Sequence, residues 1–168
     1  MRIERKVENV RVVRHRTILE ALRVLARNPS ARKAMFSSTE EIQHNILDAP
    51  LARVYEGDVV YRRDCGVVSV REVCEYADFV HRLTRGGYYP AGTNETVAYL
   101  SVLAAEKVRI DGVVHLGTRI LDESYQEYRL LMRAPGLYEL LPFFPRTKLQ
   151  PGYHIVVVRE EEVPIKKR

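Results

Sequence analysis

The chain has few of the residues that build metal and disulfide sites. Its 168 residues contain no tryptophan and only two cysteines, Cys65 and Cys74. No CxxC pair occurs, and the spacing of the two cysteines fits no zinc site. A Cys65–Cys74 disulfide is expected only if the source is a hyperthermophile, because other cytosols keep thiols reduced. Cys74 is otherwise predicted to be a small core residue.

Long apolar runs are also missing. No stretch of about 18 apolar residues occurs, so no membrane-spanning helix is predicted. Met1 to Arg16 is interrupted by charge every second or third residue, unlike the apolar core of a signal peptide. Hydrophobic residues make up 46% of the chain and charged residues 29%, which is typical of a soluble folded protein. We therefore expect a protein that is made and kept, at least initially, inside a cell.

Recognisable catalytic motifs are missing as well. The five histidines form no HxH, HxxxH or HExxH pattern, and no GxSxG occurs. The glycine-rich stretch 85–92 has no Walker lysine and is interpreted as a loop between helices. Asp78 and His81 lie one helical turn apart, where a hydrogen bond explains them better than a metal. The sequence thus predicts no enzyme, no cofactor and no metal, although a small enzyme with an unrecognised site stays open.

Basic charge is concentrated in the first fifth of the chain. Residues 1–33 contain ten Lys or Arg against three Glu, a net charge of +7, whereas the whole chain carries +5. Apolar residues recur there at spacings of three and four, which predicts a helix over about Arg5 to Arg27. These apolar residues are Ile3, Val7, Val10, Ile18, Leu22 and Leu25. A second helix is predicted over about Ser30 to Leu47, after the Asn28-Pro29 turn.

Arginine outnumbers lysine in this arm, and guanidinium groups form bidentate pairs with phosphate oxygens. The segregated charge therefore predicts a nucleic-acid-binding arm. The predicted contact residues are Arg5, Lys6, Arg11, Arg14, Arg16, Arg23, Arg27, Arg32 and Lys33. A solvated helix face in a thermophile protein is the main alternative. A membrane-surface helix or a basic protein-docking segment are the others, and the lack of large aromatics on the apolar face weakens the membrane case.

The remaining helices are predicted from apolar stripes. They cover about Ser69 to Arg85, closed by Gly86-Gly87, then about Glu95 to Arg109, which is almost wholly apolar and predicted to lie at the centre of a bundle. Two more are predicted over Val113 to Arg133 and Leu137 to Phe144. The stretch from Leu51 to Val68 is interpreted as a linker, with a short strand near Val59–Tyr61 as the alternative.

The end of the chain changes character. Tyr153 to Val158 is predicted to be a strand without obvious partners in the chain, so it is expected to pair with another subunit. The fold class predicted is all-α, a helical bundle with an N-terminal basic helix-turn-helix arm and a short strand-containing C-terminal tail. The predicted segments are the arm at 1–50, a linker at 51–68, the bundle at 69–146 and the tail at 147–168.

This layout resembles the major capsid proteins of filamentous archaeal viruses, of the rudivirus, lipothrixvirus and tristromavirus type. The resemblance rests on Asn28-Pro29, Gly86-Gly87, Tyr125 with Tyr128, and Pro135-Gly136 before a short apolar helix. It covers about residues 14 to 144. It implies that paired subunits, identical or paralogous, wrap double-stranded DNA in an A-like form and assemble into a helical filament. It also implies a hyperthermophilic archaeal virus, with the protein made in the host cytoplasm and found in the virion.

The leading functional hypothesis is therefore a structural virion protein that packages DNA through phosphate contacts. Such contacts neutralise the backbone without reading bases. The alternative is a cellular DNA-binding protein or transcription regulator that uses residues 69–85 in a helix-turn-helix. Glu72, Glu75 and Asp78 on the polar side of that helix disfavour this alternative, because they would meet the DNA groove.

Overall fold

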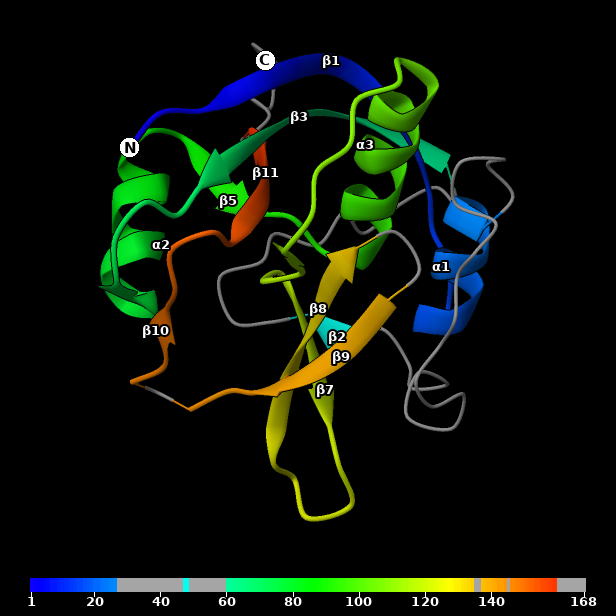
Figure 1. Ribbon diagram of the computed structural model, residues 1–168. Helices are drawn as coiled ribbons and strands as arrows, with labels where there is room; N and C mark the ends of the chain where they lie inside the picture. Colours follow the sequence, from blue (N-terminus) through cyan, green and yellow to red (C-terminus); the bar gives the residue numbers. More distant parts are fainter. Residues whose placement is uncertain (27–46, 49–59, 135–136, 145, 160–168) are drawn as a thin grey trace, which may run out of the picture.

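A large β-sheet dominates the protein (Figure 1), so the all-α prediction is wrong. The structure is a computed structural model that describes residues 1–26, 47–48, 60–134, 137–144 and 146–159. The predicted helix over about 30–47 lies almost entirely outside the described residues, as do Arg27, Arg32 and Lys33. No helix in the described ranges is long and apolar enough to cross a membrane.

The sheet is assembled from strands distant in the sequence. Its main path runs in the order β1 (Glu4–Val13), β3 (Val60–Ser69), β11 (His154–Arg159), β6 (Val113–Val114), β8 (Glu127–Ala134), β7 (Thr118–Leu121) and β2 (Leu47–Asp48). Beside this path, β5 (Tyr88–Pro90) pairs with β11 and β9 (Leu137–Pro142) pairs with β8. The pairing of β11 with β6 is parallel, and the other pairings are antiparallel. A separate ribbon pairs β4 (Cys74–Glu75) with β10 (Lys148–Leu149).

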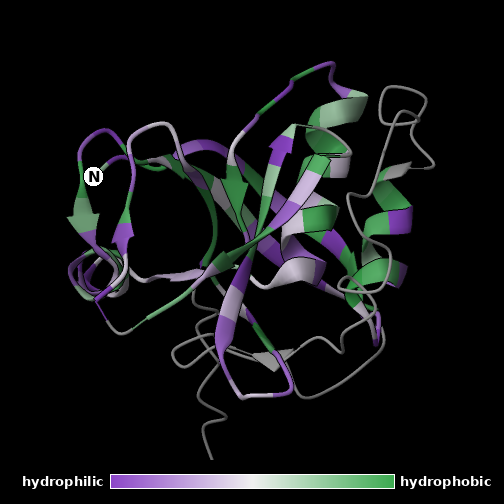
Figure 2. Cartoon of the chain, turned by 60° about the horizontal axis from the view of Figure 1, so that its bottom comes forward, coloured by the Kyte–Doolittle hydropathy of each residue, from purple (hydrophilic) through white to green (hydrophobic). Residues whose placement is uncertain are grey.

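Three helices cover the two faces of this sheet in the described part of the chain. One face packs its core against α1 (Ile18–Ala26) and α3 (Thr93–Ala105). The other packs against α2 (Tyr76–Arg85). Figure 1 shows α2 on one side of the molecule and α1 and α3 on the other, while Figure 2 shows hydrophobic residues along the central strands. Strand β11 is therefore buried on both faces, with Val156 and Val158 in one core and Ile155 and Val157 in the other.

The predicted basic helix is instead a strand, a turn and a short helix, because β1 contains two irregularities. Val7 pairs with Cys65 and Val10 pairs with Arg63, so a step of three residues along β1 corresponds to a step of two residues along β3. Such bulges place residues three apart on one face of a strand, which imitates helical spacing. The true helix α1 begins only at Ile18. Residues 4–13 of the projecting arm predicted from the charge thus form an integral strand of the sheet.

The other predicted elements divide into two groups. The helix ending at Gly86-Gly87 is confirmed over its second half, but Ser69 belongs to β3 and the helix begins at Tyr76. The helix predicted from Glu95 is confirmed as α3, although it packs on the sheet and not in a bundle. The linker, apart from residues 51–59 outside the described ranges, is the central strand β3. Residues 113–133 and 137–144 form strands β6 to β9 instead of helices.

The C-terminal strand is confirmed, but its predicted pairing with another subunit is wrong. β11 lies inside the sheet, where it pairs with β3, β5 and β6 of the same chain. Its residues Ile155 to Val158 are all buried. Each of the four predicted segments contributes strands to this one sheet. The all-α layout on which the capsid resemblance rested is therefore not what the described residues form.

Candidate functional site

The first turn of α3 is polar and buried, in contrast to the rest of the helix. Thr93, Asn94, Glu95 and Thr96 are each at most 9% exposed. The preceding Gly92 provides no side-chain cap for the helix. Four consecutive polar residues against an apolar core need partners, because a buried polar group without one costs about 1–3 kcal/mol. Their partners define the site, which we call the α3 polar cluster.

Glu95 is held by a tyrosine of the sheet. The Tyr61 hydroxyl on β3 donates a hydrogen bond of 2.6 Å to Glu95 Oε1. Burial, followed by the negative charge of Glu95, raises the pKa of Tyr61 far above its ordinary value, while the positive charges of Arg63 and Arg14 oppose the shift. Tyr61 therefore stays a neutral donor at physiological pH. The carboxylate and the phenol are thus in direct contact, and the Arg63 guanidinium lies over the Tyr61 ring, 5.9 Å from its centroid.

Asn94 fixes the turn between β1 and α1 against the same helix end. The backbone N–H of His15 donates to Asn94 Oδ1 over 3.2 Å, and Asn94 Nδ2 donates to the His15 carbonyl over 3.5 Å. This paired contact resembles a backbone ladder and holds Arg14, the preceding residue, beside the cluster. The arginine is therefore positioned by an amide side chain from α3.

A buried histidine completes the cluster on the side of the sheet. His115 Nδ1 lies 3.2 Å from Thr93 Oγ1, and the Thr93 N–H donates to Thr118 Oγ1 over 2.7 Å. His115 is wholly buried, and burial lowers its pKa to about 3. The imidazole is therefore neutral at physiological pH and acts as a hydrogen-bonding group, not as a cation.

Two glycines allow these segments to approach closely. A Cβ on Gly92 would lie 2.9 Å from Glu95 Oε2 and 3.4 Å from Thr118 Oγ1. A Cβ on Gly117 would lie 2.5 Å from the carbonyl of Ala91, which accepts a hydrogen bond from the Gly117 N–H. The loop before α3 and the turn before β7 therefore touch backbone to backbone, and this contact places Thr118 against Thr93.

Three polar atoms of the cluster are buried and have no hydrogen-bond partner among the described residues. They are Arg14 Nη2, Thr96 Oγ1 and His115 Nε2. Thr96 lies three residues after Thr93, on the same side of the helix as the contact with His115. Native proteins leave few such groups, and each one calls for an explanation such as a bound molecule or ion. The cluster also contains the N-terminus of a 13-residue helix, where the peptide dipoles favour negative charge.

The predicted nucleic-acid contacts do not gather on one helix. Arg5, Lys6 and Arg11 are exposed on β1, Arg16 is exposed in the following turn, and Arg23 is exposed on α1. Among the described members of this set, Arg14 directly precedes His15, whose backbone is bound by Asn94 of the α3 polar cluster. Arg27, Arg32 and Lys33 lie outside the described residues.

The other sequence-derived candidates give no site. No group of three or more His, Cys, Asp or Glu in the described part of the chain is arranged to hold a metal ion. Cys65 and Cys74 are both free thiols. The α3 polar cluster was not predicted from the sequence, although its signal was present as the run Thr-Asn-Glu-Thr opening an otherwise apolar helix.

Comparison with known proteins assigns no relative. No protein-family model, no curated protein and no solved structure matches the chain. The function of the protein is therefore inferred from the geometry of the described residues and from their chemistry.

Proposed function

We propose that the protein binds a small molecule carrying an oxyanion, a carboxylate or a phosphate, at the α3 polar cluster. The observation that carries the proposal is the guanidinium of Arg14, whose buried Nη2 has no partner among the described residues. The next residue, His15, is bound through its backbone to Asn94 in the first turn of α3, which brings this segment to the positive end of the helix. A buried donor on a charged group is among the most costly atoms to leave unsatisfied. An oxyanion is the partner that a guanidinium and a helix N-terminus both favour.

The surrounding groups limit the ligand to a small and polar one. Thr96 Oγ1 and His115 Nε2 provide two further polar atoms without partners in the described part of the chain, and neither carries charge. One oxygen of Glu95 already accepts a hydrogen bond from Tyr61, which holds the carboxylate in place. Its negative charge disfavours a ligand anion directly beside it. A ligand with one oxyanion at Arg14 and a neutral hydroxyl or carbonyl toward Thr96 matches this pattern.

Thermal unfolding with simple probes tests the proposal. Acetate, succinate and inorganic phosphate are compared at equal ionic strength against sodium chloride, so that carboxylate and phosphate sources are separated. A ligand at about one hundred times its Kd stabilises the folded state by about 2.7 kcal/mol. For a chain of this length, that corresponds to a rise in Tm of about 5–10 °C.

Two neighbouring arginines give a matched comparison. Arg14→Gln is expected to abolish the ligand-induced rise in Tm. Arg16→Gln should keep it, because Arg16 is exposed and its backbone N–H is bound to Glu20. The proposal fails if no probe raises the Tm of the wild type above the chloride control, or if Arg14→Gln retains the full rise.

A second candidate function is sequence-tolerant nucleic-acid binding on the outer face of β1 and β3. Arg11 pairs directly with Arg62 across these strands, and both are exposed. Like charges directly opposite each other destabilise a sheet, and a bridging phosphate removes that repulsion. Asp64 lies nearby, where its Oδ1 accepts from the Asn9 N–H at 2.8 Å.

The salt dependence of DNA binding tests this second function. Replacing both arginines, Arg11→Gln with Arg62→Gln, should reduce the log–log salt slope by about 0.9 for each phosphate that the variant no longer neutralises. Arg85→Gln, an exposed change on α2, should leave the slope unchanged. Wild-type binding that is confined to one DNA sequence, or a slope unaffected by the double change, would contradict it.

A further inference from the structure

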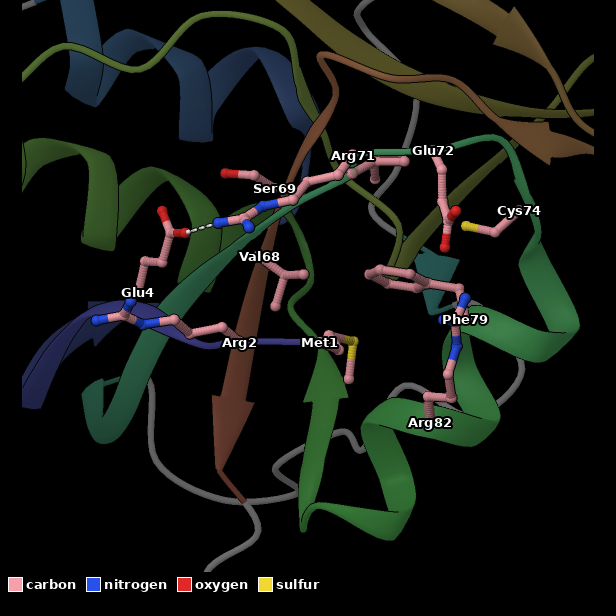
Figure 3. Close-up of a pocket in the computed structure, with 11 residues that line it drawn as sticks. Met1, Arg2, Glu4, Val68, Ser69, Arg71, Glu72, Cys74, Phe79 and Arg82 are labelled. Atoms are coloured by element: carbon pink, nitrogen blue, oxygen red, sulfur yellow. Dashed lines mark hydrogen bonds and ion pairs between the residues drawn. The ribbon is translucent and has the colours of Figure 1, made fainter.

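A cavity lies on the face of the sheet opposite the α3 polar cluster, at the beginning of the chain. It has a volume of about 260 Å³. Three segments line it: the residues leading into β1, the end of β3 with the loop that follows, and α2 (Figure 3). None of its lining residues belongs to the α3 polar cluster, so the two regions can be tested separately.

The inner wall of this cavity is apolar. Val68, Val70 and Phe79 line it and are almost wholly buried, while Met1 lies over them and is 57% exposed. Figure 3 shows the Met1 side chain close to Val68 and the Phe79 ring. This wall fits an aliphatic group of a few carbons.

The end of the cavity near Cys74 carries two opposite charges. Arg82 on α2 and Glu72 in the loop before β4 both line it, and Figure 3 shows both side chains directed toward the Cys74 sulfur. Among the described residues, neither charged group takes part in an ion pair of 4 Å or less, whereas Arg71 is already paired with Glu4 at 3.3 Å. At this end of the cavity a ligand therefore meets a cation and an anion that are not ion-paired with a described residue, while Arg82 Nε donates to the Asp78 carbonyl over 3.4 Å.

We propose that this cavity binds a free amino acid with a branched aliphatic side chain. The α-carboxylate pairs with Arg82, the α-ammonium with Glu72, and the side chain lies against Val68, Val70 and Phe79. A cavity of this volume has room for several water molecules, and therefore for a small organic molecule. A zwitterion with adjacent charges satisfies both residues at once.

Modification of Cys74 by iodoacetamide reports on occupancy in the intact protein. Cys74 is partly exposed at the cavity, while Cys65 is 2% exposed, so mass spectrometry resolves a label on Cys74 from one on Cys65. At ten times its Kd a bound amino acid occupies about nine-tenths of the sites, and the labelling rate of Cys74 should fall about tenfold. The ratio of labelling rates with and without leucine is compared within each variant, because changes at Arg82 and Glu72 also alter the intrinsic reactivity of the Cys74 thiol.

Two analogues of leucine test the need for both charges. 4-Methylpentanoate lacks the ammonium group and 3-methylbutylamine lacks the carboxylate, but both keep the aliphatic chain. Each should bind at least about tenfold more weakly than leucine, the effect expected when one charge-assisted hydrogen bond is absent. Equal protection by either analogue would overturn the assignment, as would no protection by leucine, isoleucine or valine up to the solubility limit of each.

Variants identify the residues that recognise each charge. Arg82→Gln should weaken leucine binding about tenfold, so that leucine and 3-methylbutylamine bind with similar affinity. Glu72→Gln should make the affinities of leucine and 4-methylpentanoate similar. Arg85→Gln, one turn-length further along α2, and Arg14→Gln should leave protection intact. Both charge changes are at exposed residues, and a melting curve confirms folding. Full leucine affinity in both Arg82→Gln and Glu72→Gln would refute the proposal.

Discussion

His115 makes the stability of this protein sensitive to mildly acidic pH. The side chain is wholly buried, and burial lowers its pKa to about 3, whereas a histidine in an unfolded chain titrates near 6.5. Below pH 6.5 the unfolded state therefore binds a proton that the folded state rejects. The free energy of unfolding then falls with decreasing pH at up to about 1.4 kcal/mol per pH unit, until the folded-state pKa is reached.

The range from pH 7.5 to 4.5 isolates this effect, because most carboxylates titrate near or below its lower limit. Over that range the single group should remove about 2.7 kcal/mol from the free energy of unfolding. For a chain of this length the Tm should fall by about 5–10 °C. Urea unfolding curves at pH 7.5, 6.5, 5.5 and 4.5 measure the free energy directly, with the slope of each curve checking that unfolding stays two-state.

A pair of histidine variants decides whether His115 is the cause. His115→Gln should lower stability at pH 7.5, because a buried side chain in contact with Thr93 is replaced, but its stability should be nearly constant down to pH 4.5. His81→Gln, at an exposed position of α2, should keep the wild-type pH dependence. The reasoning is refuted if the wild type loses less than about 1 kcal/mol over this range, or if His115→Gln loses as much as the wild type.

Three further substitutions test the core and the cluster. Tyr61→Phe removes the donor to buried Glu95, so unfolding measurements should show a decrease in stability of about 1.5–3 kcal/mol. Adding Glu95→Gln to this variant should destabilise it much less than Glu95→Gln destabilises the wild type. Fully additive losses of stability would contradict the contact. Leu131→Ala should cost about 2–5 kcal/mol because Leu131 is wholly buried, whereas Leu137→Ala, at a position 49% exposed, should cost little. Gly117→Ala should lower the Tm markedly and disturb amide exchange around α3, because its Cβ would overlap backbone atoms; an unchanged Tm would exclude that close contact.

Part of the fold is predictable from single stretches of the sequence. The C-terminal strand follows from its run of valines, and α2 ends at Gly86-Gly87 because Gly87 adopts a positive φ of 75°. α3 is long and apolar enough to be recognised without its neighbours. These elements share one property: their local pattern agrees with their place in the fold.

In the strands that the sequence predicts as helices, the local pattern of apolar residues does not match the structure that they form. β8 is buried on both faces, with Leu130 and Met132 in one core and Leu131 in the other, so its apolar residues are continuous instead of alternating. Periodicity does not separate such a strand from a buried helix. In β1 the bulges shift the spacing of the valines to three, which imitates a helical repeat. The abundance of β-branched valine was the better signal, since it favours strands over helices.

The candidate site was hidden for a different reason, because its members come from separate parts of the chain. Tyr61, Glu95 and His115 lie on a strand, a helix and a sheet turn, and only the order of strands in the sheet brings them together. The concentration of arginine near the N-terminus was interpreted as one surface. The sheet distributes those residues, exposing Arg11 and placing Arg14 at the cluster.

The α3 polar cluster, proposed above as a ligand site, differs in one respect from a purely structural network. Buried charges are often no more stabilising than apolar residues of similar size, so stability alone gives little reason for the sequence Thr-Asn-Glu-Thr at this position. A network that served only the fold would be expected to satisfy its own donors and acceptors. This one satisfies Tyr61 and Asn94 fully enough to fix the helix end, yet leaves atoms of Arg14, Thr96 and His115 without partners among the described residues. A preorganised binding site needs polar groups that are held in place by the fold but have no partner within it. The ligand measurements on Arg14→Gln test directly whether the cluster is such a site.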